Sequence, residues 1–199
     1  MTNYPSLAAA VEPVATGAAV VTVAFIGETP AFVCADGTIL LIDPGSPRSV
    51  TAHDDGGILV AASDGRLIVT GGDDGRVVAT DARGVVAPVG DENGRWIDAV
   101  AVRDGAIAWT SGRNARARDA KGVVRMQELP STSRGVAFFP KGYRLAISHY
   151  NGATLWFPNA GKPENLAWNG SHIDITVSPA RVLTMTGVIS AWNAPDSMA

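Results

Sequence analysis

The stretch DGTILLID at residues 36–43 returns 38 residues later as DGRVVATD at residues 74–81. The same step separates RGVV at residues 83–86 from KGVV at residues 121–124. A period of roughly 20 to 50 residues is typical of repeat proteins, whose units bury their apolar faces only against each other. We therefore expect a repeat architecture rather than one ordinary globular core.

Within each repeat, short apolar runs alternate with tight turns. The second repeat shows the pattern, with ILVAAS, RLIVTGG and RVVATD separated by SDG and by Asp74-Gly75. An Asx-Gly pair between apolar runs is a strong hairpin signal, because both residues tolerate a positive φ. A weaker fourth run, GVVAPV, completes the repeat. Four strands in about 40 residues, without helical periodicity, predict an all-β protein whose repeats form four-stranded β-propeller blades.

The repeated stretches resemble the WD40-repeat family. Residues 36–43, 74–81 and NGATLW at 151–156 resemble the turn and third strand that end in Trp-Asp in this family, and Ala52-His53 stands where the family has Gly-His. Trp and Asp never occur together here, since three repeats keep only the Asp and two keep only the Trp. The resemblance implies a propeller that acts as a non-enzymatic scaffold or protein-protein interaction module.

We divide the chain into an N-terminal segment, residues 1–17, and about five blades at residues 18–53, 54–91, 92–131, 132–170 and 171–199. The last repeat ends soon after its third strand. Residues 6–15 are therefore expected to supply the missing strand and close a five-bladed ring, alone or with a second copy of the chain. The alternative is a truncated part of a seven-bladed WD40 propeller, in which case the incomplete ring could form a homo-oligomer.

The family resemblance also implies a buried structural relay in the second repeat, formed by His53, Thr70 and Asp74. The alternative for these residue types is a hydrolase triad, but the sequence has no Gly-x-Ser-x-Gly elbow. The three histidines and Cys34 show no zinc-ligand spacing. We expect no metal and no cofactor.

Loops before the first strand of each repeat are expected to gather on one face and bind a protein partner. These segments combine aromatic and charged side chains; the candidates for partner binding are Trp96, Trp168, His172, Asp54, Asp91 and Glu92. For the two tryptophans, packing between blades is the alternative.

Basic side chains are concentrated in the third repeat, at Arg113, Arg116, Arg118, Lys121 and Arg125. Arg116 and Arg118 alternate with alanines, so both should lie on one face of a strand. They either form a solvated outer strand or a basic patch for an acidic protein segment or a phosphate. Nucleic acid is not expected, because aromatic residues are not interleaved with the basic ones.

An enzyme is the main alternative function: a propeller hydrolase or lyase with its site in the central channel. Asp98, Asp174 and His172 are its candidates, since they precede strands that should line the channel. No complete catalytic motif is visible, so we expect no enzymatic activity. A structural subunit of a larger complex is a further alternative.

The composition limits the location of the protein. Apolar residues make up 46% of the chain and charged residues 18%, which is enough to bury a core. A net charge of −3 provides no general attraction to nucleic acid or anionic lipid. The single cysteine fits a reducing compartment, and the N-terminus lacks the basic start of a signal peptide. We expect a cytoplasmic protein without membrane contact.

Overall fold

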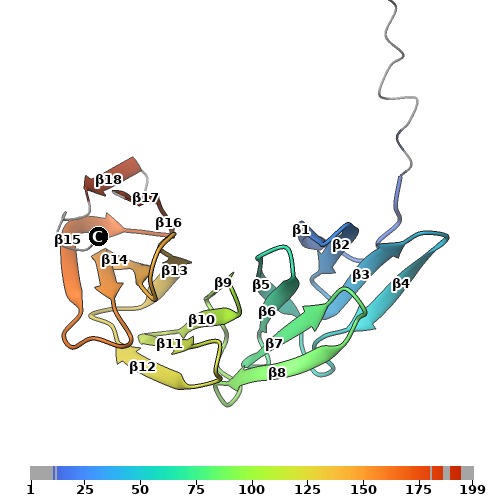
Figure 1. Ribbon diagram of the computed structural model, residues 1–199, viewed down its shortest axis with the longest axis horizontal. Helices are drawn as coiled ribbons and strands as arrows, with labels where there is room; N and C mark the ends of the chain where they lie inside the picture. The colour runs from blue at the N-terminus through green and yellow to red at the C-terminus, as the bar shows by residue number, and fades with distance from the viewer. Residues whose placement is uncertain (1–10, 12, 180, 186–188, 194–199) are drawn as a thin grey trace, which may run out of the picture.

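The computed structural model of the protein describes residues 11, 13–179, 181–185 and 189–193. These residues contain eighteen β-strands and no helix. The strands form five antiparallel sheets that follow one another along the chain (Figure 1). The predicted all-β class is therefore confirmed, and the sheets are arranged as the blades of a β-propeller are.

The first three sheets have four strands each, hydrogen-bonded in chain order. Sheet 1 contains β1 (Val20–Ile26), β2 (Thr29–Cys34), β3 (Thr38–Asp43) and β4 (Ser46–Thr51). Sheet 2 contains β5 (Ile58–Ser63), β6 (Leu67–Gly72), β7 (Arg76–Asp81) and β8 (Val86–Asp91). Sheet 3 contains β9 (Ala99–Arg103), β10 (Ala106–Ser111), β11 (Asn114–Arg118) and β12 (Val124–Glu128).

The last two sheets have three described strands each. Sheet 4 contains β13 (Ser133–Phe138), β14 (Leu145–Trp156) and β15 (Glu164–Ser171). Sheet 5 contains β16 (Asp174–Val177), β17 (Arg181–Met185) and β18 (Ile189–Asn193).

Strand β14 is one long strand where the sequence predicts two strands and an Asn151-Gly152 turn. Both turn residues have a positive φ, 63° and 146°. His149 Nε2 lies 2.9 Å from Thr154 Oγ1, although five residues of straight strand would separate them by about 17 Å. The chain therefore reverses at Asn151-Gly152, and the predicted hairpin lies within β14.

Packing between sheets forms the core. Four clusters of buried residues each join one sheet to the next along the chain. They join Ile39 and Leu41 of sheet 1 to Ile68 of sheet 2, Val69 and Val77 of sheet 2 to Trp109 of sheet 3, Ala108 and Ala115 of sheet 3 to Ile147 of sheet 4, and Ala153 and Leu155 of sheet 4 to Val182 of sheet 5. We call the face of a sheet that is directed toward the next sheet its back face and the opposite face its front face.

The five sheets form an open arc, with sheet 1 and sheet 5 at its two ends (Figure 1). The sequence predicted that residues 6–15 would close a five-bladed ring. Residues 6–10 and 12 lie outside the described residues, and Val11 and residues 13–15 belong to no strand. The described residues thus form an open arc and no closed ring (Figure 1). The alternative, part of a larger ring, agrees with the open arc.

Glycine is required at the predicted Asx-Gly turns for two separate reasons. Gly37 has a φ of 90°, and a Cβ placed there would lie 2.6 Å from the carbonyl oxygen of Gly56 as well as against the carbonyl of His53. Gly65, in the turn between β5 and β6, has a similar φ of 82° but open space around it. Backbone strain therefore applies to both glycines, and a close approach of neighbouring backbone only to Gly37.

This difference predicts unequal costs for two alanine substitutions. Gly65→Ala should lower the free energy of unfolding by about 1 kcal/mol through φ strain alone. Gly37→Ala should lower it by about 3 kcal/mol, because the turn must also move away from residues 53 and 56. Urea denaturation of both variants measures the difference, and equal costs would contradict the close approach.

Candidate functional site

The loop before the first strand of a sheet is hydrogen-bonded to a turn of the preceding sheet. Glu92 N donates to the carbonyl of Gly75 at 2.8 Å, and His53 N donates to that of Gly37 at 3.1 Å. These loops therefore lie at the same edge of successive sheets. We call this edge the loop face; its loops are residues 52–57, 92–98, 129–132 and 172–173.

A polar side chain at one position of every loop reaches the second strand of the sheet that follows. The position recurs at steps of 39, 39 and 41 residues, as His53, Glu92, Ser131 and His172. The bonded partners in the second strands are Thr70 at 2.9 Å, Trp109 at 2.8 Å, His149 at 3.4 Å and Thr184 at 2.7 Å. Sequence reasoning missed this pattern because four different side chains fill one role, although the repeat period alone identifies the position.

The three residues of the predicted relay form one hydrogen-bonded network. His53 Nδ1 lies 2.9 Å from Asp74 Oδ2, and Nε2 lies 2.9 Å from Thr70 Oγ1. His53 and Thr70 are both buried. A triad that acts on a substrate must be reached by it, so this burial favours a structural role.

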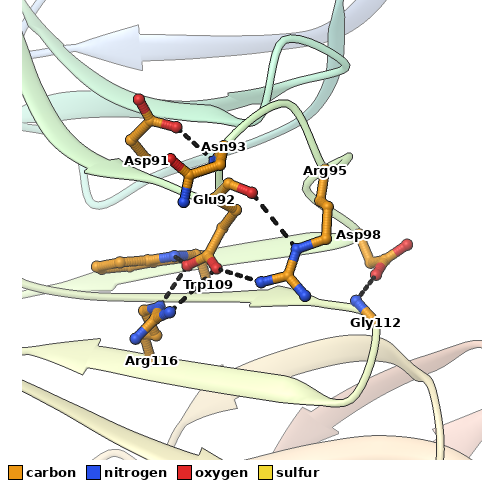
Figure 2. A network of polar contacts seen from close by, with 8 residues as sticks. All are labelled: Asp91, Glu92, Asn93, Arg95, Asp98, Trp109, Gly112 and Arg116. Carbon is orange, nitrogen blue, oxygen red and sulfur yellow. Dashed lines mark hydrogen bonds and ion pairs between the residues drawn. The ribbon is translucent and has the colours of Figure 1, made fainter.

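Glu92 is the centre of a second network, shown in Figure 2. Glu92 is 1% exposed, and its carboxylate accepts a hydrogen bond from Trp109 Nε1 at 2.8 Å. It also pairs with Arg116, through two nitrogens, and with Arg95 at 3.4 Å. Two guanidinium groups and an indole N–H thus balance one buried charge, as burial of a carboxylate requires.

Two predictions fail at this network. Glu92 was a candidate for partner binding, but it is buried beneath the loop face. Arg116 was a member of the basic patch, but its side chain faces sheet 2 and is paired with Glu92. Both errors have one cause. An unpaired charge is unstable between two packed sheets, so Glu92 and Arg116 form an ion pair there.

The remaining basic side chains of the third repeat do not form a common free patch. Arg113 pairs with Glu128 at 3.0 Å and Arg125 with Asp119 at 3.7 Å. Lys121 is exposed and Arg118 half-buried, and neither has an ion pair within the described ranges.

His172 was predicted both as a partner contact and as a channel residue, and both predictions are wrong. Its side chain is fully buried. Nδ1 lies 2.7 Å from Thr184 Oγ1, and Nε2 lies 3.1 Å from the carbonyl oxygen of Trp168. The ring is held between sheets 4 and 5, because Thr184 lies in β17 of sheet 5 and Trp168 lies in β15 of sheet 4.

The two aspartates of the enzyme hypothesis do line one depression, on the concave side of the arc, together with Arg134. Asp98 Oδ2 accepts a hydrogen bond from Gly112 N at 2.6 Å, and Asp174 Oδ1 accepts one from Ile175 N at 2.7 Å. Since His172 points elsewhere, the three proposed catalytic side chains are not brought together.

The exposed candidates are Trp96, Trp168, Asp54 and Asp91. Trp96 is 66% exposed, within loop 92–98, and lines a depression on the loop face with Arg95, Asp98 and Arg113. Asp91 Oδ1 accepts a hydrogen bond from Asn93 N at 2.6 Å, which shapes the start of this loop (Figure 2). Trp168, 55% exposed, lies in β15 of sheet 4.

The described part of the chain also bears on metal binding and on membrane crossing. No group of three or more His, Cys, Asp or Glu side chains there could hold a metal ion. No helix that could cross a lipid bilayer occurs in the ranges that the structure describes.

Comparison with known proteins identifies the fold. No protein-family model matches the sequence, and no curated protein matches it. Among solved structures 997 chains match, so the fold is too widely shared to select a function. One is a chain of "Crystal Structure of Mitotic Checkpoint Complex", with a TM-score of 0.69 and 17% identity over 89% of this chain. This protein spans 62% of that chain's length, and the likeness establishes the fold alone.

Removing the Glu92 carboxylate should be costly. Glu92→Ala leaves Arg116 and the Trp109 indole without their shared partner, so we expect a loss of about 3–5 kcal/mol in the free energy of unfolding. Glu128→Ala is the matched control, because its pair with Arg113 is exposed and should contribute about 0–1 kcal/mol. Chemical denaturation measures both, and similar losses would contradict a buried network.

The buried histidine of sheet 4 predicts a pH dependence. Burial lowers the pKa of His149 below its ordinary value, and the nearby His172 lowers it further, against an opposing effect of the Tyr150 carbonyl. Below about pH 6.5 the unfolded chain therefore binds a proton that the folded chain does not, so stability falls as the pH falls. Denaturation from about pH 7 to pH 5 should show a smaller slope for His149→Gln than for the wild type. Equal slopes would exclude His149 as the cause.

Proposed function

We propose that this protein is a non-enzymatic β-propeller scaffold that binds a protein partner on its loop face, with Trp96 as the anchor. The observation that carries the proposal is the exposure of this large aromatic side chain, 66%, within a loop held on both sides. Aromatic side chains in the centre of an interface contribute much of the binding free energy of protein complexes.

The neighbours of Trp96 fix the loop that carries it. Arg95 Nη2 pairs with the buried Glu92 carboxylate at 3.4 Å, and its Nε donates to the carbonyl of Glu92. Ile97 is buried, and its amide donates to the carbonyl of Gly72 at 3.1 Å. An indole presented by an ordered loop loses little conformational entropy on binding, which favours recognition.

The surroundings of Trp96 suggest the chemistry of the partner. Arg95 and Arg113 line the same depression, and both side chains are largely exposed despite their ion pairs. Guanidinium groups beside an indole favour a segment that combines an apolar side chain with carboxylates. The partner is therefore an acidic protein segment with an apolar anchor.

Two other considerations support a scaffold. His172 is buried away from the depression that Asp98 and Asp174 line, so the three residues considered for a hydrolase or lyase are not brought together. The similar chain belongs to a structure described as a complex, which favours protein partners for this chain as well. Cytoplasmic location is part of the proposal, because the single cysteine, buried Cys34, fits a reducing compartment.

The test is a pull-down from native cells with quantitative mass spectrometry. Trp96→Ala should reduce the capture of bound proteins at least about tenfold, since a central aromatic contributes about 2 kcal/mol or more. Val123→Ala is the control: Val123 is exposed in the turn between β11 and β12, at the opposite edge of the sheets.

Both variants must melt like the wild type, which removes unfolding as a cause. Equal capture by Trp96→Ala and the wild type would place the partner elsewhere. Loss of capture in Val123→Ala alone would move the interface to the opposite edge.

A further inference from the structure

The middle strands of the sheets differ between the interior and the ends of the arc. In sheet 3, all six residues of β10 are buried, so both faces are covered. In sheet 1, the residues Ala31 and Val33 of β2 are buried while Phe32 between them is not. In sheet 5, β17 alternates strictly between exposed and buried. Adjacent residues point to opposite faces, so each terminal sheet has one open face.

The front face of sheet 1 is apolar and open. Val23 and Phe25 of β1 are each 62% exposed, and Val21 is exposed as well. Val23 is the cross-strand partner of Phe32, which is in turn the partner of Leu40 in β3. The apolar row therefore crosses three strands, as the rows inside the arc do.

The back face of sheet 5 is open as well, and it combines the apolar side chains of Leu183 and Met185 with Asp174, Thr176 and Arg181. Leu183 is 39% exposed and Met185 is exposed beside it. Thr176 of β16 pairs with Leu183, and all three residues line one shallow, mainly apolar depression. Apolar surface left open in this way is typical of an interface.

These two faces cannot cover each other within one molecule, because they lie at opposite ends of the arc (Figure 1). All four interfaces inside the chain nevertheless join a back face to a front face. The described residues thus leave one copy of each half of the repeating interface uncovered.

We infer that a second copy of this chain is the occupant: the back face of sheet 5 in one molecule packs on the front face of sheet 1 in the next. The contact continues the sheet-to-sheet packing of the arc across two chains. It is head-to-tail, so it joins two different surfaces and leaves one free face at each end of a pair. The inference rests on the fold and not on the partner bound at the loop face.

Two single variants test this arrangement. Phe25→Asp places a charge on the front face, and Leu183→Asp places one on the back face. Both side chains are exposed, so both variants should fold, as circular dichroism and thermal melting can verify. Val123→Asp, at an exposed position away from both faces, is the matched control.

Sedimentation velocity over a wide range of concentrations gives the result. The wild type and Val123→Asp should associate, and each face variant alone should be monomeric. An equimolar mixture of Phe25→Asp and Leu183→Asp should form dimers and no larger species, because one intact back face and one intact front face remain. Only head-to-tail packing restores association in this way.

Three outcomes would overturn the inference. One is a wild type that stays monomeric at every concentration. A wild type whose open faces bind only a different protein gives this same result. Another is association that neither face variant reduces. The third is a mixture of the two variants that stays monomeric, since one intact back face and one intact front face would then not be sufficient for association.

Discussion

Each sheet in this chain depends on its neighbours to keep two apolar faces from water. A four-stranded sheet of about 25 residues buries little by itself, and its middle strand becomes fully buried only when both faces are covered. The contrast between β10, buried throughout, and β17, buried at every second residue, shows this dependence directly. Stability, the position of the loops and the open ends of the arc all follow from this one packing relation.

The loops are ordered by the same packing. Because neighbouring sheets approach closely, His53, Glu92 and His172 are buried, and each must find a hydrogen-bond partner in the sheet that follows. His53, Glu92, Ser131 and His172 do so with different chemistry at one repeated position. A position with such varied solutions constrains residue identity weakly, so the repeats keep the same architecture with different side chains there.

The Glu92 network connects this structural requirement to recognition. The carboxylate holds Arg116 of sheet 3 and Arg95 of its own loop, and Arg95 directly precedes the exposed Trp96. The buried charge therefore fixes the backbone on which the indole is presented. The proposed partner contact at Trp96 is thus separate from the residues that maintain the loop, so the contact residue can vary without loss of the fold.

Local patterns in the sequence were sufficient for the strands, the turns and the propeller class. The 38-residue step, the alternation in the strands and the Asx-Gly pairs at Gly37 and Gly75 depend on contacts within one repeat, where the chain closes short loops. The relay residues were grouped through the family resemblance. Tertiary structure alone decided that Glu92 and His172 are buried, that Arg116 is paired, and that the arc stays open. Burial and pairing depend on which sheet covers a face and at what angle, and no interaction within a single repeat specifies that.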